Sequence, residues 1–353
     1  MNQINKMKVM LSEDYKSEGI ILAWPSIYES KIYWGDLLRV YYEIITSCLQ
    51  YDKKIILIIQ KGRNIYDDLE LIGKDISDQI KVKGEFFQLY EIDYNDIWMR
   101  DYCPLTFINK SNHKYYFNIT RFNGYGNKYA CDKDKILSFK FIKKYQEENN
   151  RYQKEYLKIF NDLIIEPGNI IFDKNLILIN KTPLLLHNDL DWKSINDILK
   201  IGIEDFLGAR YEIINVQPIN GDDTNGHIDN LIRLENTNYL YYMASNDTKH
   251  PDYRLLMNLK DQLMRITLKN KKIIPLYHDH LDVVRDHKDN ILPFSYLNYI
   301  RIGSLIFMPI NKNTSLSKKN EIKKIFHYAD VIFIEITSLL NERGGLHCCS
   351  MNI

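Results

Sequence analysis

Short runs of apolar residues, many of them β-branched or aromatic, alternate along the chain with amphipathic stretches. Each run has the length and composition of a buried strand. The strand-like runs are Lys54–Gln60, Ile170–Ile179, Tyr239–Ala244, Ser304–Ile310 and Val331–Ile336. The longest of them, Ile170–Ile179, predicts a hairpin that turns at Asp173–Asn175.

The amphipathic stretches predict helices between these strands. One helix is expected at Pro251–Thr267, with Pro251 in its first turn, and another at Lys318–Ala329. This alternation of strands and helices is typical of an α/β fold. No linker rich in Pro, Gly or Ser divides the chain and no repeat is visible, so we expect one domain over residues 1–353.

The charge is balanced, with 47 Lys and Arg against 46 Asp and Glu, and no basic block interrupts the chain. This argues against a nucleic-acid partner. Apolar runs such as Ile55–Ile59 are far shorter than the ~18 residues of a membrane span, and the N-terminus lacks the apolar core of a signal peptide. We therefore expect a cytoplasmic protein with no membrane partner.

The cysteines are five in number, and no pair has the spacing of zinc ligands. We therefore expect reduced thiols and neither a metal nor another cofactor. Cys348 and Cys349 are adjacent near the chain end, where chains usually fray, so either this segment is held in the core or a thiol reacts. After the pair Gly344–Gly345 a cysteine could be a nucleophile, but a buried cysteine is more often inert.

Two segments place carboxylates beside apolar residues. In Asp96–Phe107, Arg100 and Asp101 follow Trp98; a surface ion pair beside a core tryptophan explains this segment as well as a binding site does. Glu166 lies between an apolar run and a Pro-Gly turn, at the expected mouth of a strand pair. Taken alone, Glu166 is better explained as an acceptor for the amides of that turn.

A third segment, Asn220–Leu234, places His227 and Asp229 on either side of Ile228. If this run is a strand, both polar side chains lie on one face. Such a pair fits a general acid/base beside a charged anchor. The alternative is that Asp229 only satisfies a buried His227.

The segment His278–His287 contains three histidines and three aspartates. His278 and His280 would share a strand face, but the spacing fits no particular metal site. A solvated polar segment is the better interpretation.

Together these groups suit one type of chemistry. A planar guanidinium is bound best by carboxylates that accept paired hydrogen bonds, for which Asp101, Glu166 and Asp229 are candidates. A cysteine could attack the guanidinium carbon while a histidine protonates the departing amine. The hypothesis is a metal-free deiminase that converts a guanidine to a urea through a covalent intermediate.

The sequence also resembles the agmatine deiminase group of the guanidino-group-modifying enzymes, which include bacterial peptidylarginine deiminase. The resemblance runs nearly end to end, in eight segments that occur in the family's order. They are "EGIILAWPS", "WMRDYCPLTF", "FNGYGNKY", "EPGNI", "DTNGHIDNL", "NDTKHPDY", "LPFSYLNYIRIGSLIFMP" and "GLHC". Tyr125 in the third segment replaces a tryptophan, and Pro167 in the fourth replaces a glycine.

The resemblance implies an α/β-propeller of the pentein type, with five ββαβ units around a pseudo-fivefold axis and the active site in the central channel. It implies that Cys348 is the nucleophile, delivered by the final strand edge, and that Cys349 points to the other face. It further implies that His227 is the acid/base, that Asp101, Glu166 and Asp229 hold the guanidinium, and that Trp98 forms a pocket wall. A homodimer is possible.

The resemblance predicts agmatine as substrate, hydrolysed to N-carbamoylputrescine and ammonia on a route to putrescine. Agmatine has two cationic ends, so acids are expected at the far end of its pocket, and Asp222 and Asp223 are candidates. An enzyme for arginine or peptidyl-arginine is the alternative, and it could use Arg343, which departs from the family's Gly-Gly-Asn. Two further alternatives are a guanidinium-binding protein without turnover and a metal hydrolase built on His278.

Overall fold

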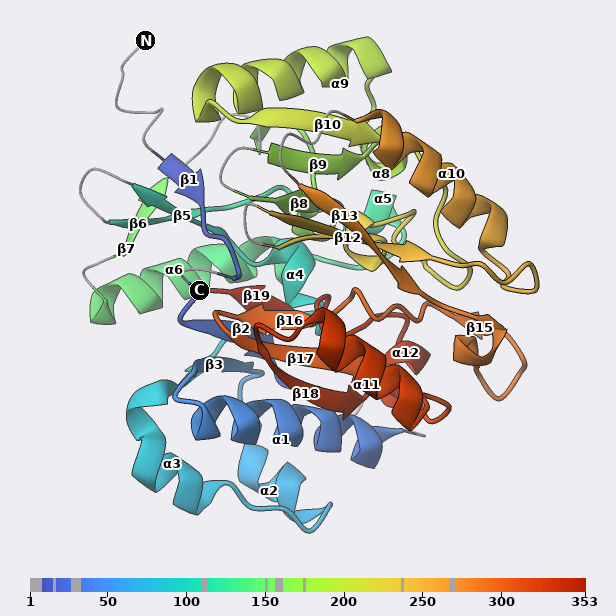
Figure 1. The fold of residues 1–353 in the computed structure, drawn as a ribbon. Helices are drawn as coiled ribbons and strands as arrows, with labels where there is room; N and C mark the ends of the chain where they lie inside the picture. Colours follow the sequence, from blue (N-terminus) through green and yellow to red (C-terminus); the bar gives the residue numbers. More distant parts are fainter. Residues whose placement is uncertain are drawn as a thin grey trace.

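The computed structural model describes residues 8–14, 17–26, 33–109, 114–149, 152–155, 161–173, 176–235, 238–266 and 271–353. Five sheets in these ranges repeat one pattern: an antiparallel strand pair, followed across a helical connection by a parallel strand. Figure 1 shows helices on the outside of the molecule and the sheets toward its middle. An α/β fold is therefore confirmed.

The strands of the five sheets have the following bounds. The first sheet contains β1 (Lys8–Met10), β5 (Leu105–Asn109), β6 (Tyr115–Asn118) and β7 (Tyr152–Glu155). The second contains β8 (Ile170–Phe172), β9 (Leu176–Asn180) and β10 (Arg210–Ile214), and the third β11 (Ile232–Glu235), β12 (Tyr239–Ala244) and β13 (Lys272–Tyr277). The fourth contains β16 (Ile300–Ile302), β17 (Leu305–Ile310) and β18 (Asp330–Glu335), and the fifth β19 (Ser350–Asn352), β2 (Gly19–Ala23), β3 (Lys54–Ile59) and β4 (Phe87–Glu91). A separate short ribbon pairs β14 (Val284–Arg285) with β15 (Ile291–Leu292).

Helices make the crossovers, because parallel neighbours cannot be joined by a tight turn. The α-helical segments are α1 (Trp34–Gln50), α2 (Ile65–Glu70), α3 (Ser77–Lys83), α4 (Met99–Tyr102), α5 (Gly124–Asn127), α6 (Asp134–Glu148), α8 (Lys181–His187), α9 (Trp192–Leu199), α10 (Tyr253–Arg265), α11 (Leu316–Ile325) and α12 (Thr337–Asn341). Short helical turns are η2 (Gly84–Phe86), η3 (Pro167–Asn169), η5 (Ile228–Asn230) and η6 (His280–Asp282), and η4 (Lys200–Leu207) is π-helical.

The apolar pattern explains why these elements form. In α10, Leu256, Leu259 and Leu263 recur at helical spacing and are buried on one face. β17 is buried at every position, as a strand covered on both faces requires. The five predicted strand runs and both predicted helices are confirmed to within a few residues at their ends.

The predicted hairpin is also confirmed, since β8 pairs antiparallel with β9. Two of the three residues of its expected turn, Lys174 and Asn175, lie outside the described residues. The prediction for Pro251 was wrong by two positions. Pro251 precedes Asp252, the residue that caps α10, because the helix begins at Tyr253.

The two ends of the chain meet in the fifth sheet. β19 pairs antiparallel with β2, and the Ile353 amide donates to the Gly19 carbonyl at 3.0 Å. Figure 1 shows the last strand beside the first strands of the chain. The segment that contains both neighbouring cysteines is thus held in the core, which is one of the two alternatives that the sequence left open, and does not fray.

The apolar side chains form two buried clusters on the two sides of this sheet. Ile20 and Leu22 of β2 face the first cluster, whereas Ile21 and Ala23 face the second. This alternation follows from the two-residue period of a strand. No helix among the described residues has both the length and the apolar character needed to cross a membrane.

Candidate active site

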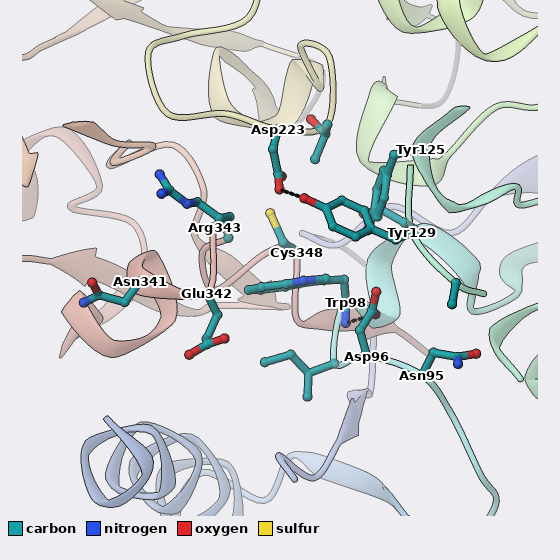
Figure 2. A pocket seen from close by; sticks show the side chains of 15 residues that line it. Asn95, Asp96, Trp98, Tyr125, Tyr129, Asp223, Asn341, Glu342, Arg343 and Cys348 are labelled. Carbon is teal, nitrogen blue, oxygen red and sulfur yellow. Dashed lines mark hydrogen bonds between the residues drawn. The ribbon is translucent and has the colours of Figure 1, made fainter. Parts of the chain in front are cut away.

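A cavity of about 380 Å³ opens beside the C-terminal turn. Figure 2 shows Cys348 in this cavity with Trp98 on one side and Asp223 and Tyr129 on the other. The lining residues come from segments far apart in the chain. They are Asn95, Asp96, Ile97, Trp98, Asp101, Tyr125, Tyr129, Ala130, Asp223, Thr224, Asn341, Glu342, Arg343, Gly344 and Cys348.

The two adjacent cysteines have different surroundings. Cys348 lines the cavity, whereas Cys349 is fully buried in the first apolar cluster and its thiol donates to the Leu346 carbonyl at 3.2 Å. The Cys348 thiol is therefore the one that a molecule in the cavity can reach. Burial, together with the negative charges of Asp229 and Asp101, raises the pKa of the Cys348 thiol well above its usual value.

Asn298 holds the turn that carries Cys348. Its Oδ1 accepts hydrogen bonds from the backbone amides of His347 at 2.9 Å and Cys348 at 3.4 Å. Backbone amides can only donate, so the atom that accepts from them must be the side-chain oxygen. The side-chain nitrogen of Asn298 therefore points away from these two amides. That nitrogen lies 3.2 Å from the Cys348 sulphur, where it can stabilise a thiolate.

His227 lies between two carboxylates. Nδ1 is 3.5 Å from Asp101 Oδ1 and Nε2 is 3.9 Å from Glu166 Oε2, and neither nitrogen makes a hydrogen bond within the described part of the chain. Burial opposes protonation of this imidazole, but the negative charges of Asp101 and Glu166 outweigh it and raise the pKa of His227 to about 10. His227 is therefore an imidazolium at neutral pH.

The strand predicted around His227 and Asp229 is wrong. His227 precedes the short turn η5, which contains Asp229, and its backbone amide donates to Thr224 Oγ1 at 3.1 Å. The turn still buries both side chains, which are at most 1% exposed. Sequence alternation alone could not distinguish this turn from a strand, because both place the two side chains near each other.

Asp101 is buried, and a surface ion pair with Arg100 is excluded because both side chains are inside the protein. The Gly168 amide donates to Asp101 Oδ1 at 3.1 Å. A Cβ atom at Gly168 would lie 2.7 Å from both Asp101 Oδ1 and His227 Nδ1, so the close approach needs a glycine. Burial raises the pKa of Asp101 to about 6, with Asp229 and Glu166 adding to the rise and His227 opposing it.

Glu166 does not accept bonds from the amides of the Pro-Gly turn. No such bond occurs in the described structure, and the carboxylate instead lies 2.9 Å from His187 Nδ1. Burial opposes ionisation, but contacts with His187 and His227 outweigh it and lower the pKa of Glu166 to about 2. Pro167 is the first residue of η3, a position that needs no amide donor.

Asp229 is connected to a charged network behind the cavity. Its Oδ2 lies 2.7 Å from His347 Nδ1, and His347 Nε2 lies 2.9 Å from Glu13 Oε1. Glu13 in turn pairs with Arg100 and Arg233. Burial opposes ionisation of Asp229, but His347 outweighs it and lowers the pKa of that carboxyl. Asp229 Oδ1 has no hydrogen-bond partner among the described residues, so it is available to a ligand.

The remaining predicted residues, Trp98 and Asp223, line the cavity directly. Trp98 forms one wall, and Asp223 accepts a hydrogen bond from Tyr129 Oη at 2.8 Å. Arg343 also lines the cavity, but its guanidinium lies 3.6 Å from Asp286 Oδ2, which is not part of the lining. In Figure 2 the Arg343 side chain points away from Cys348.

The structure thus brings Cys348, His227, Asp101, Asp229, Glu166, Trp98 and Asp223 to this cavity or behind its lining. Asp222, the other acid expected there, does not line the cavity, and its carboxylate accepts from the Thr224 amide at 2.8 Å. Asn298, His187 and Glu13 were not predicted. Asn298 contacts Cys348 at a separation of 50 positions, and His187 contacts Glu166 at a separation of 21. Glu13 contacts His347 at a separation of 334 positions, and His347 in turn contacts Asp229. The segment Leu292–Pro309 contains Asn298 and was one of the family-like stretches, which is the only sequence signal that singled it out.

The prediction of a solvated segment is wrong at His278 but holds at His280, Arg285 and His287, which are exposed. His278 is 2% exposed, and its two ring nitrogens contact the Leu276 carbonyl and the Tyr296 amide, each at 3.1 Å. His278 and His280 also do not share a strand, since β13 ends at Tyr277 and His280 begins η6.

Comparisons with known proteins identify similar sequences and similar folds. The chain is 22% identical to a protein of Marinomonas sp. (strain MWYL1) provisionally named as an agmatine deiminase, over 98% of this chain and 94% of that one. Its fold is similar to that of a C. jejuni agmatine deiminase, with a TM-score of 0.76, 22% identity, and 98% and 96% of the two chains covered. It is also similar to a structure provisionally named as an arginine deiminase of Porphyromonas gingivalis, with a TM-score of 0.78, 21% identity and 98% of both chains covered.

A match to a family model shows which family the chain belongs to. The family model described as Porphyromonas-type peptidyl-arginine deiminase matches residues 9–353, which is almost the whole chain. The similarity predicted from the eight segments is therefore confirmed. This chain belongs to the Porphyromonas-type peptidyl-arginine deiminase family.

Proposed function

We propose that this protein is an agmatine deiminase, which hydrolyses agmatine to N-carbamoylputrescine and ammonia. The observation that carries the proposal is the set of three buried carboxylates, Asp101, Glu166 and Asp229, gathered around His227 beside a cysteine thiol. Like charges in one small cavity repel each other, and a cationic ligand relieves that repulsion. The names of the Marinomonas and C. jejuni relatives agree with this substrate.

The carboxylates suit a guanidinium better than an ammonium. A guanidinium is planar and presents several N–H groups, so separate carboxylates can each accept from a different edge. Asp229 Oδ1 is available for this purpose, and its Oδ2 lies 3.9 Å from the Cys348 sulphur. A guanidinium held by Asp229 would therefore have its carbon near the attacking atom.

Binding of the cation also prepares the nucleophile. The pKa of Cys348 is raised by burial and then by Asp229 and Asp101, so the thiol is protonated before a cation binds. A bound guanidinium neutralises those two carboxylates and favours the thiolate, whose proton leaves to solvent. The side-chain nitrogen of Asn298, 3.2 Å from the sulphur, then stabilises the thiolate.

The reaction proceeds in two halves. The thiolate attacks the guanidinium carbon, and the His227 imidazolium donates a proton to one amino group, which leaves as ammonia. The product of this half is a thiouronium bound to Cys348. Neutral His227 then takes one proton from a water molecule that attacks the same carbon. Collapse of the adduct breaks the carbon–sulphur bond, the remaining hydroxyl proton passes to the departing sulphur, and the urea and the Cys348 thiol are released.

The acidic lining of the cavity favours agmatine over arginine. Asp223 and Glu342 are among the lining residues, and carboxylates suit the second cationic end of agmatine. Arginine would instead need a cation for its carboxylate. Arg343 is the candidate, but Asp286 already pairs with it. Arginine or peptidyl-arginine remains the alternative substrate, because turning the Arg343 side chain inward would supply that cation.

The arrangement of the five sheets supports a pentein-type propeller as part of the proposal. Each sheet repeats the ββαβ pattern, and the fifth combines strands from both chain ends. Closure of these five units around one axis would place the cavity in a central channel. A role in putrescine biosynthesis, a cytoplasmic location and a homodimer stay predictions from the resemblance.

The test is formation of the ureido product from agmatine, free arginine and a peptidyl-arginine, with Cys348→Ala and Cys349→Ala alongside. We expect turnover of agmatine alone, lost in Cys348→Ala and retained in Cys349→Ala. Turnover of the arginine compounds would support the alternative substrate. If Cys349→Ala were the inactive variant, the assignment of the nucleophile would be wrong. No turnover of any substrate would favour a guanidinium-binding protein.

A further inference from the structure

Tyr125 contacts the site without a role in the reaction described above. It lines the cavity, is 4% exposed, and its Oη donates a hydrogen bond to Asp101 Oδ2 at 2.9 Å. Its ring centroid lies 5.9 Å from that of His227. The phenol therefore touches one candidate catalytic group and packs beside another.

The backbone that carries Tyr125 is unusual. All four residues of α5 have positive φ, from 58° at Tyr125 to 76° at Gly126. A bulky residue rarely adopts this left-handed region, and such outliers persist only where the surrounding structure imposes them. A Cβ atom at Gly124 would lie 2.2 Å from the Tyr129 carbonyl oxygen, so the turn also needs a glycine there.

Local hydrogen bonds hold this turn in place. The Asn123 side chain accepts from the Gly126 amide at 2.9 Å and donates to the His187 carbonyl at 3.2 Å. The Lys128 amide donates to the Gly124 carbonyl at 2.9 Å. The Tyr125 ring packs edge-on against Phe122 at 5.1 Å. The phenol is thus presented to Asp101 by a rigid turn.

Asp101 is consequently held from two sides. The Gly168 amide occupies Oδ1 and the Tyr125 hydroxyl occupies Oδ2, so the plane of the carboxylate is fixed. Each oxygen keeps a second lone pair for a guanidinium or for His227. We propose that Tyr125 is a positioning residue, which orients Asp101 and keeps it ionised for guanidinium binding by donating a hydrogen bond to Oδ2. This inference rests on the proposed function.

The charges around Asp101 make this hydrogen bond consequential. His227 favours the ionised form of Asp101. The carboxyls of Asp229, Glu166 and Asp96 face Asp101 with like charge. Cys348 lies beyond these groups, and Arg100 precedes Asp101 on α4. Burial already raises the pKa of Asp101 to about 6, and the Tyr125 hydrogen bond opposes the rise. Removing the hydroxyl should therefore leave Asp101 protonated at a higher pH.

The experiment compares Tyr125→Phe with Tyr129→Phe, each made in Cys348→Ala so that binding is measured without turnover. Tyr129 is the matched control, since it loses the same atom in the same segment but donates to Asp223. The readout is the pH dependence of agmatine affinity by calorimetry between pH 5 and 9. We expect Tyr125→Phe to move the acidic midpoint upward by roughly one pH unit, since each hydrogen bond to a carboxylate contributes about that much. Tyr129→Phe should weaken binding without moving the midpoint.

Other outcomes overturn the inference. If both variants move the midpoint, or neither does, Tyr125 does not act through Asp101. If Cys348→Ala itself does not bind agmatine, the proposed function fails, which is a separate result. Circular dichroism checks that each variant folds. If Tyr125→Phe does not fold, Tyr125→Met replaces it, because it also lacks the hydroxyl and fills much of the same space, and the same midpoint shift is required.

Discussion

Two clusters of histidine and carboxylate side chains in this protein contain similar residue types and differ in structure. The His227 cluster comprises His227, Asp101, Glu166 and Asp229, and the His278 cluster comprises His278, Asp279, His280 and Asp282. Both central histidines are buried. The difference lies in what their nitrogens contact.

The polar groups of the His278 cluster are already satisfied. Backbone groups of Leu276 and Tyr296 occupy both ring nitrogens of His278, and Asp282 accepts from Tyr296 Oη at 2.5 Å. Burial, followed by the nearby His250, lowers the pKa of His278 to about 3. In the His227 cluster, by contrast, neither ring nitrogen makes a hydrogen bond in the described structure, and the pKa is raised to about 10. Buried polar groups left unpaired indicate a ligand site, whereas the same residue types fully paired indicate a structural role.

The largest expected effect is on turnover. His227→Gln should lower kcat for agmatine by about 10²–10⁴-fold, because it removes the proton donor and acceptor. His278→Gln should leave kcat nearly unchanged and cost about 1–3 kcal/mol of stability, because buried partners lose their hydrogen bonds. Steady-state kinetics and urea denaturation separate the two results. Equal losses of kcat in both variants would contradict the comparison.

The two histidines should also give pH dependences of stability with opposite signs. The folded pKa of His227, about 10, lies above the unfolded value of ~6.5. Its contribution to the free energy of unfolding is therefore present below pH 6.5 and is lost as the pH rises toward 10. The folded pKa of His278, about 3, lies below the unfolded value, so its contribution is present above pH 6.5 and is lost as the pH falls toward 3. Through each histidine, the free energy of unfolding changes by at most about 1.4 kcal/mol per pH unit.

Urea denaturation of the unliganded protein between pH 4 and 9.5 measures both slopes. His227→Gln should flatten the alkaline decline only, and His278→Gln the acidic decline only. The contrast between the two histidines would be wrong if His227→Gln flattened the acidic decline or His278→Gln flattened the alkaline decline.

A smaller effect is expected from ligand binding. Agmatine at 100 times its Kd should raise the unfolding free energy by about 2.7 kcal/mol, because it binds the folded state only. Asp229→Asn, which removes a carboxylate from the His227 cluster, should abolish most of this stabilisation, whereas Asp282→Asn in the His278 cluster should not. Thermal denaturation with and without agmatine is the measurement, and no stabilisation of the unaltered protein would count against the proposed function.

The smallest expected effect is that of a chelator. If the His278 cluster were a hydrolytic metal site, EDTA would inhibit turnover. We expect no change in kcat after dialysis against EDTA, since the groups that would bind the ion are already hydrogen-bonded. Inhibition that is reversed by one added divalent ion would restore the metal-hydrolase alternative.

The sequence alone determined much of the local structure. Strands such as β12 and β17 follow from continuous apolar runs, and α10 follows from the spacing of its leucines. These signals are local, since a residue's own neighbours decide which face is apolar. The order of the eight family-like segments likewise predicted the family and the seven candidate site residues.

Local patterns did not determine the repeated architecture. No repeat was visible in the sequence, yet five sheets share one strand pattern. Each unit needs only apolar positions at the right period, and many different residues satisfy that requirement. The fifth unit joins Gly19–Ala23 to Ser350–Asn352, a pairing that no local pattern contains.

The tertiary structure alone decided which polar groups are paired and which are available. Glu13 reaches His347 across 334 positions, His187 pairs with Glu166, and Tyr125 reaches Asp101 from a left-handed turn. Hydrogen bonds and charge interactions depend on distances of a few ångströms between groups, and only the folded chain sets those distances. The sequence therefore predicted the residue types that the chemistry needs, and the structure determined that the ring nitrogens of His227 are unpaired among the described residues whereas those of His278 are paired.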